Sequence, residues 1–283
     1  MSEINWSAIT ITDNYMFQTV FSDPELCKEL LERVLHIEID HVEVLDAERS
    51  LIPEPRAHGI RMDVYIADGH GTIYDVEVQK YDSDDLVKRS RYYLSANDMD
   101  CIVAGQDYHS MRNSFVIFIC MFDPIKHGLP RYTITTFCRE TDSEMFDGTT
   151  RVFVNPTAWE RCSDPRLRPF LKYLEENTME DDGFCIRVDE AVRRVRDRPE
   201  WRQNRMKWEC ALMDERRIGR AEGRTEGKAE GRAERQSLIA QLKDAMVGDG
   251  RTEEFLDAVG DASRVDALLS EYHIEWHDQK QAT

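Results

Sequence analysis

The 283-residue sequence contains no long apolar run. Its longest, "FVIFICMF" at 115–122, has the length of a buried strand and falls well short of the roughly 18 to 20 residues that cross a bilayer. The first residues, "MSEINWSAIT", lack the basic and then apolar layout of a signal peptide. We therefore expect no membrane segment and a cytoplasmic location.

Closely spaced cysteines are also absent. The seven cysteines are odd in number and include no C-x-x-C pair, so the sequence favours neither a disulfide framework nor a thiolate zinc site. We expect these side chains to behave as small buried apolar groups.

Positive charge is scarce, with 37 Lys and Arg against 55 Asp and Glu and a net charge of −18. This balance argues against a protein that coats nucleic acid, because phosphate neutralisation needs clustered basic residues. The segment 193–235 is different, since it holds 14 basic and 9 acidic residues. Any contact with DNA phosphates is expected there.

Hydrophobic periodicity divides the first 138 residues into helices and strands. Helical spacing covers 13–35, where Pro24 starts a second helix, and 82–102, which begins with acidic residues. Alternating or continuous apolar residues predict strands at 37–51, 60–67, 72–79, 114–122 and 131–138. This order indicates an α/β fold in which a mixed sheet is flanked by helices.

The pattern is helical after about residue 156, with helices expected at 165–178 and 188–235. The second ends in "GRAEGRTEGKAEGRAER", where a glycine at every fourth position costs a helix roughly 1 kcal/mol each. We favour a flexible charged spacer here over a marginal solvated helix whose glycine stripe admits a partner helix. The predicted domains are 1–158, a charged helical extension at 159–235 and a small helical module at 236–275. Association of copies is expected in this C-terminal region.

The stretch "RMDVYIADGHGTIYDVEVQK", at 61–80, predicts a hairpin with an acidic face. A three-residue turn at 69–71 pairs Ala67 with Ile73. The same register gives three further pairs, Tyr65 with Asp75, Asp63 with Glu77 and Arg61 with Gln79. Facing carboxylates are destabilising unless a cation compensates, and two of them suit Mg²⁺ or Mn²⁺. The other interpretation is the solvent side of an edge hairpin.

The D-V-Y and E-V-Q parts of this hairpin resemble the core of PD-(D/E)xK nucleases, and more closely the recombination-promoting nuclease and transposase family, which has Gln in the usual lysine position. Two flanking pieces support the resemblance. "TDNYMFQTVF", at 12–21, is similar to the family's D-x-x-F-K-x-x-F segment, and "KRSRYYLS", at 88–95, to its R-x-x-x-Y helix. The glutamate-glycine repeat is similar to the family's charged tail. The resemblance covers about residues 10–155.

The resemblance implies a restriction-endonuclease-like core with a helical C-terminal extension and the activity of a metal-dependent DNA endonuclease. Asp63, Glu77 and the backbone carbonyl of Val78 would hold Mg²⁺, or Mn²⁺ in its place. Gln79 would orient the attacking water, but a neutral amide supplies no positive charge. The implied partner is DNA.

Three further residues are candidates with structural alternatives. Arg89 and Tyr93 lie one helical turn apart, so Arg89 is expected to touch phosphate or the carboxylates, with Tyr93 beside it; the alternatives are a surface cation and a core aromatic. Asp13, from the first helix, is either an added acidic site residue or a helix N-cap. No role is assigned to the histidines at 58, 70 and 109.

A second, non-enzymatic function stays open from the sequence. The Gln79 substitution fits a degenerate nuclease fold that serves as a nucleic-acid or protein-binding module. Its basic segment at 193–235 and its helical tail would then make the contacts.

Overall fold

The computed structural model describes residues 4–46, 49–51, 60–102 and 107–274. The chain forms two compact units, Met1–Arg205 and Met206–Thr283. The first unit extends beyond residue 158, where the sequence analysis ends the nuclease-like domain, because later helices contribute to its core. His58 lies outside the described residues.

The helices of the first unit begin at local signals in the sequence. Asp13 and Asp23 accept hydrogen bonds from main-chain N–H groups in the first turns of α1 and α2, and Pro24 is the first residue of α2. The bounds are α1 Asn14–Phe21, α2 Pro24–Leu35, α3 Leu86–Cys101, α4 Leu167–Glu176 and α5 Gly183–Arg196. Short 3₁₀ turns lie at Trp6–Ala8, Tyr108–Ser110 and Pro156–Arg161. The predicted pair of helices in 13–35, divided at Pro24, is confirmed.

A six-stranded mixed sheet forms the centre of this unit, in the order β1-β4-β5-β6-β10-β7. Its strands are β1 Val42–Asp46, β4 Val64–Asp68, β5 Ile73–Gln79, β6 Ser114–Cys120, β7 Arg131–Ile134 and β10 Thr149–Val154. The central strands β5, β6 and β10 run parallel, and the outer pairs are antiparallel. Two small ribbons stand apart, β2 Arg49–Leu51 with β3 Ile60–Met62, and β8 Thr136–Cys138 with β9 Ser143–Met145.

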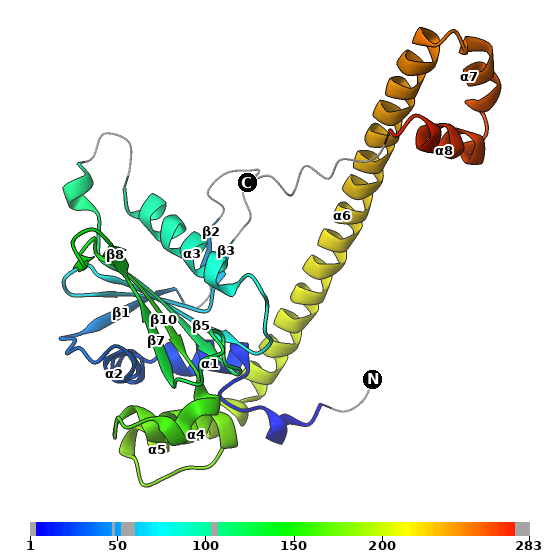
Figure 1. Cartoon of the computed structure of the whole chain (residues 1–283). Helices are drawn as coiled ribbons and strands as arrows, with labels where there is room; N and C mark the ends of the chain where they lie inside the picture. The colour runs from blue at the N-terminus through cyan, green and yellow to red at the C-terminus, as the bar shows by residue number, and fades with distance from the viewer. Residues whose placement is uncertain (1–3, 47–48, 52–59, 103–106, 275–283) are drawn as a thin grey trace. The chain divides into compact units, whose positions relative to one another are not determined.

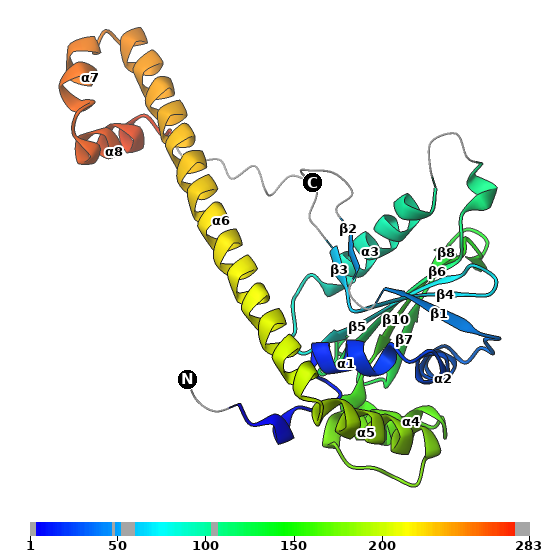
Figure 2. The same cartoon turned by 180° about the vertical axis from the view of Figure 1, so that it is seen from behind.

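Helices cover both faces of the sheet, which confirms the predicted α/β class. Figures 1 and 2 show α3 on one face and α1, α2, α4 and α5 on the other. Val76 and Val78 of β5 pack into the core shared with α1, α2, α4 and α5. Ile73 of the same strand faces the α3 side, where Phe118 and Tyr93 lie. Because side chains alternate along a strand, β5 is apolar toward one helical layer and acidic toward the other.

Three strand predictions are corrected, and one strand was missed. The segment 60–67 divides into β3 and β4, which belong to different sheets. The segment 37–51 holds two strands rather than one, and 131–138 divides into β7 and β8, of which only β7 joins the main sheet. Strand β10 was not predicted. Its first half, "TTR", is polar and partly exposed, and only Val152, Phe153 and Val154 are buried, so the alternation that marks a strand is weak.

The hairpin register is confirmed at its turn and changes at its open end. Ala67 pairs with Ile73 and Tyr65 with Asp75, but the ladder ends at the next pair and the chain bends at Asp63. Arg61 pairs with Ser50 of β2 rather than with Gln79. The solvent-side interpretation of the acidic face is wrong, because the side chains of this face lie in the interior beside α3.

The second unit consists of helices. Helix α6 spans Pro199–Gly248, starting in the first unit, and α7 Thr252–Ala258 and α8 Ala262–Glu271 follow. The preferred interpretation of the repeat as a flexible spacer is wrong, since 219–235 is helical throughout. The end of α6, α7 and α8 share an apolar cluster that includes Leu242, Met246 and Phe255, and the small helical module at 236–275 stays a prediction. Within the described residues, no helix is long and apolar enough to cross a membrane.

Candidate active site

The site lies where the chain enters β4 and where β5 ends. Asp63 stands at the bend before β4, and Glu77 and Gln79 are in the last three residues of β5. Asp63 and Glu77 are only 5% and 6% exposed. Since β5 is a central strand covered on both faces, these carboxylates are held by packed main chain.

Asp63 accepts hydrogen bonds from two parts of the fold. One oxygen, Oδ2, accepts from the main-chain N–H of Val78 at 3.0 Å, which joins the bend to β5. The other, Oδ1, accepts from Nε2 of Gln18 on α1 at 2.8 Å. Helix α1 therefore fixes the orientation of this carboxylate.

Glu77 contacts the main chain of Asp63. Its Oε1 accepts a hydrogen bond from the main-chain N–H of Asp63 at 2.9 Å. The predicted closeness of Asp63 and Glu77 is thus present, although a side-chain to main-chain bond makes the contact instead of a strand pair.

The carbonyl of Val78 points to the same place as Asp63. The amide Nδ2 of Asn14, on α1, donates to Val78 O and to Asp63 Oδ2, each at 3.3 Å. These two oxygens therefore converge on one point, and the Nδ2 amide group of Asn14 occupies that point. Convergent oxygens of this kind are the donor set that hard divalent cations prefer.

Asp75 adds a third buried carboxylate to the same face of β5. It is fully buried, and neither of its oxygens accepts a hydrogen bond within the described part of the chain. Burial, and then the charge of Asp63, raise the pKa of Asp75 well above its usual value. An ionised carboxylate without a partner in such a place is costly unless a cation is near.

The pKa of Glu77 is likewise raised well above its usual value. Burial raises its pKa most, followed by the charges of Asp63 and Asp75, while the main-chain hydrogen bond and Arg89 act in the opposite direction. The charge of Arg89 acts on Glu77 but leaves its pKa raised, so Asp63, Glu77 and the Val78 carbonyl together fit a divalent cation. Among the described residues, no group of three or more His, Cys, Asp or Glu side chains is placed to hold a metal ion together. Mg²⁺ commonly binds through only one or two carboxylates and keeps several waters.

Arg89 reaches the site through Gln79. Its Nη2 donates to Gln79 Oε1 at 2.5 Å, and Gln79 Nε2 donates to the carbonyl of Tyr81 at 2.7 Å. The guanidinium lies over the rings of Phe118, 5.1 Å from its centroid, and Tyr93, at 6.0 Å. α3 thus brings a positive charge to the position where the sequence has a neutral amide.

Tyr93 lies largely inside the α3 core. Burial, and then the negative charges of Glu77 and Asp75, raise the pKa of its hydroxyl far above the usual value. The phenol is consequently neutral at ordinary pH, and the structure places it beside Arg89 as the spacing predicts.

Asp13 makes the contacts of a helix N-cap, which the sequence analysis gave as the alternative to a site residue. It accepts from the N–H of Met16 as the N-cap of α1, and it forms an ion pair with Arg205 at 2.8 Å. The residues of α1 that contact Asp63 are Asn14 and Gln18, which the sequence analysis missed. Their signal was available: counted from Phe17 and Phe21, the D-x-x-F-K-x-x-F spacing falls on Asn14 and Gln18 rather than on Asp13.

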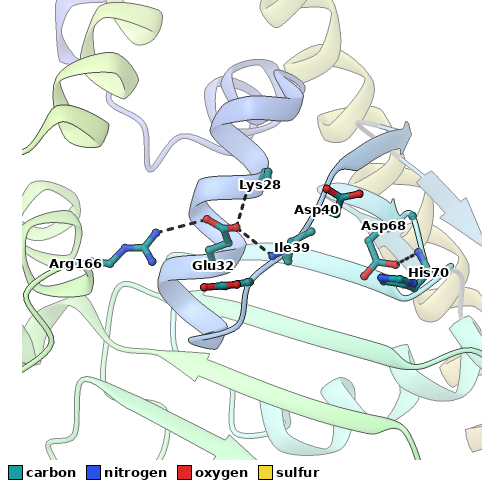
Figure 3. Close-up of a pocket in the computed structure, with 9 residues that line it drawn as sticks. Lys28, Glu32, Ile39, Asp40, Asp68, His70 and Arg166 are labelled. Atoms are coloured by element: carbon teal, nitrogen blue, oxygen red, sulfur yellow. Dashed lines mark hydrogen bonds and ion pairs between the residues drawn. The ribbon is translucent and has the colours of Figure 1, made fainter.

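A pocket of about 600 Å³ lies elsewhere, beside the hairpin turn (Figure 3). It is lined by α2, the following loop, His70 and Arg166, and its central Glu32 pairs with Lys28 at 3.0 Å and with Arg166 at 3.6 Å. This turn is at the opposite end of β5 from Glu77. This pocket and the acidic site are therefore separate. His109 is exposed on its own 3₁₀ turn.

The mixed sheet between helices, with paired carboxylates at the end of a central strand, defines a nuclease-like class of protein. The family of PD-(D/E)XK nuclease family transposases matches residues 11–218, and the chain belongs to this family. No curated protein and no solved structure matches the chain.

Proposed function

We propose that the protein is a metal-dependent DNA endonuclease that hydrolyses phosphodiester bonds in a recombination-promoting, transposase-like role. The observation that supports this most is a group of three buried carboxylates, Asp63, Asp75 and Glu77. The oxygens of Asp75 accept no hydrogen bond from the described residues. Buried carboxylates gathered in this way repel one another, and a divalent cation close by would offset their charge. Membership of the nuclease family suggests the phosphodiester as substrate.

In this proposal Asp63, Glu77 and the Val78 carbonyl hold the cation, with Mg²⁺ expected and Mn²⁺ able to replace it. The bound cation supplies a water of lowered pKa and offsets charge on the phosphate. Gln79, fixed by Arg89 and Tyr81, holds the water by hydrogen bonding. Arg89 stabilises the negative charge that builds on the phosphate. The water oxygen bonds to phosphorus and loses a proton, one ester P–O bond breaks, and the leaving oxygen takes up a proton, so that water is added across the ester bond overall.

The partners in the proposal follow from charge. The basic segment 193–235 contacts DNA phosphates, so binding weakens steeply with added salt. The C-terminal helical region joins copies of the chain. The cytoplasm is the expected location, and the seven free cysteines suit its reducing conditions.

The test is cleavage of supercoiled and linear DNA by the purified protein with Mg²⁺, with Mn²⁺ and with EDTA. Asp63→Asn and Glu77→Gln should each lower the rate about 100-fold or more, because charge stabilisation at the reacting phosphate is lost. Glu43→Gln, the same chemical change at an exposed position of β1, should leave the rate unchanged. Equal activity in EDTA, or in the two site variants, would contradict the proposal.

One observation favours a second candidate, a nuclease fold that binds nucleic acid or protein without cutting. Gln79, Asn14 and Gln18 are all neutral amides around the acidic pair, so the site lacks a lysine. The two candidates differ in one result: a binding module retains DNA without cleaving it under any metal condition.

A further inference from the structure

The repeat in α6 has an unusual layout of charge. From Gly219 to Glu234 the sequence runs through four units of Gly, Lys or Arg, Ala or Thr, and Glu, and all of it is helical. Successive residues of a helix are about 100° apart. The four residue types therefore form four stripes along the helix, in the order glycine, basic, small and acidic.

This layout stabilises a lone helix poorly. Residues four apart are neighbours on a helix, and here each basic residue has a basic neighbour and each glutamate position another glutamate. Opposite charges are two residues apart and do not face each other. The four glycines cost roughly 1 kcal/mol each relative to alanine.

Nothing within the described part of the chain covers the glycine stripe. A Cβ built on Gly219, Gly223, Gly227 or Gly231 meets no atom within 4 Å. The described side chains between 213 and 233 are exposed. Helices in proteins gain most of their stability from packing. Within the described chain, the glycine face of this segment has no such packing contact.

We propose that the face is covered by a second copy of the same segment, packed in parallel with glycine stripe against glycine stripe. Each glycine stripe has the basic stripe on one side and the acidic stripe on the other. A two-fold axis parallel to the helices places the basic side of one copy against the acidic side of its partner, at both edges of the contact. Antiparallel packing would set like charges against each other, so the charge layout selects both the partner and its direction.

The glycine period also sets the geometry of the pair. A repeat of four residues advances about 40° per unit relative to the 3.6-residue turn. Packing of such i, i+4 rows gives helices that cross at about −50°. The axes of crossed helices move apart on either side of the crossing point, so the contact between them is short. A repeat of four units, about 24 Å of helix, agrees with such a short contact.

Sedimentation of the full chain tests the partner. The monomer has a mass of 33.1 kDa, and the pair should have twice that mass. One variant carries Arg220→Glu, Arg224→Glu, Lys228→Glu and Arg232→Glu, and the other Glu222→Lys, Glu226→Lys, Glu230→Lys and Glu234→Lys. Each alone should be at least 10-fold weaker in association, and a mixture of the two should restore the pair. A monomeric wild type, or variants that associate like it, would overturn the proposal.

Glycine replacement separates pairing from helix formation. Gly223→Ala with Gly227→Ala should raise helix content by circular dichroism, because alanine is the better helix former. The same change should weaken association several-fold, because two methyl groups hold the backbones apart. Stronger association together with higher helix content would show that the glycine stripe is not the contact.

The direction of packing is measured from Cys210, which is exposed on α6. In protein with Cys101→Ser and Cys138→Ser, a spin label at this position lies about 25 Å along the helix from the centre of the repeat. Parallel packing predicts a label-to-label distance below about 30 Å, and antiparallel packing one of about 45 Å or more. The longer distance would overturn the proposed direction.

Discussion

Asp63 is the residue on which the site depends. Its two oxygens join the bend before β4, the end of β5 and α1. The sequence could predict the closeness of Asp63 and Glu77, because strand parity and a three-residue turn fix the register. Strand parity could not predict that α1 supplies two amides, since contacts 45 and 49 residues apart in the chain depend on how the helix packs on the sheet. Only the spacing of the family motif, counted from Phe17 and Phe21, pointed to Asn14 and Gln18.

Asn14→Asp tests the point where the oxygens of Asp63 and Val78 converge. The added carboxylate should lower the melting temperature in EDTA through repulsion from Asp63. It should also enlarge the rise in melting temperature caused by Mg²⁺, because the cation gains a charged ligand. Asn14→Ala, which removes the amide without adding charge, is the control. A Mg²⁺-induced rise no larger than that of the wild type would show that no cation binds there.

Asp75→Asn tests the cost of the partnerless carboxylate. An amide of the same shape removes the buried charge, so the metal-free protein should gain about 1–3 kcal/mol of unfolding free energy. Saturating Mg²⁺ should narrow the difference, since the cation offsets the charge in the wild type. Urea denaturation in EDTA and in Mg²⁺ measures both, with the exposed Asp84→Asn as control. A loss of stability in EDTA would contradict this account.

At the scale of elements, the largest departures from the sequence analysis are the buried acidic face and the helical repeat. Parity assigned the acidic residues to one face correctly, but a single hairpin cannot show that α3 covers that face. The repeat has poor local signals for a helix, and within one chain the helix is continuous with better helical sequence on either side of it. Strand β10 escaped notice because only half of it is buried.

The contact between α2 and α5 gives a prediction on pH. Asp182 caps α5 and accepts from both Nη atoms of Arg33, each at 3.1 Å. Burial raises the pKa of Asp182, but the hydrogen bond from Cys185 and the charge of Arg33 outweigh it, so the pKa is lowered overall. The stabilisation of the folded state by ionised Asp182 is therefore fully present above the carboxyl's unfolded pKa of about 3.9. It is lost as the pH falls through the lower pKa that Asp182 has in the folded protein.

Asp182→Asn retains a capping side chain and removes the charge, so it should cost about 1 kcal/mol of unfolding free energy at pH 7. The difference from the wild type should shrink below about pH 4. Denaturation curves at the two pH values measure it. Asp181→Asn, at the exposed neighbouring position, should show no such change, and a difference that grows in acid would contradict the assignment.

At the scale of the whole molecule, the first unit needs its later helices. Phe170 of α4, Val188 of α5 and Trp201 of α6 are buried in one core with α1 and α2. Trp201 also donates to Thr19, and Arg205 pairs with Asp13. The composition of 159–235 shows a charged surface and conceals these buried positions, which is why sequence alone places the boundary near 158.

Truncation tests this boundary. A fragment of residues 1–205 should unfold cooperatively, because its core is complete. A fragment of residues 1–158 exposes the apolar partners of α4 and α5 and should aggregate or lose its near-ultraviolet circular dichroism. A shorter fragment as stable as the longer one would contradict the shared core.

The most direct measurement of the central claim is calorimetric titration of Mg²⁺ into the metal-free full chain. The wild type and the exposed-site control Glu43→Gln should bind with the same affinity, while Asp63→Asn and Glu77→Gln should bind at least 10-fold more weakly, because each removes one carboxylate from the proposed ligand set. Circular dichroism confirms that the variants are folded. Equal binding by all four proteins, or none by the wild type, would contradict a metal site at Asp63 and Glu77.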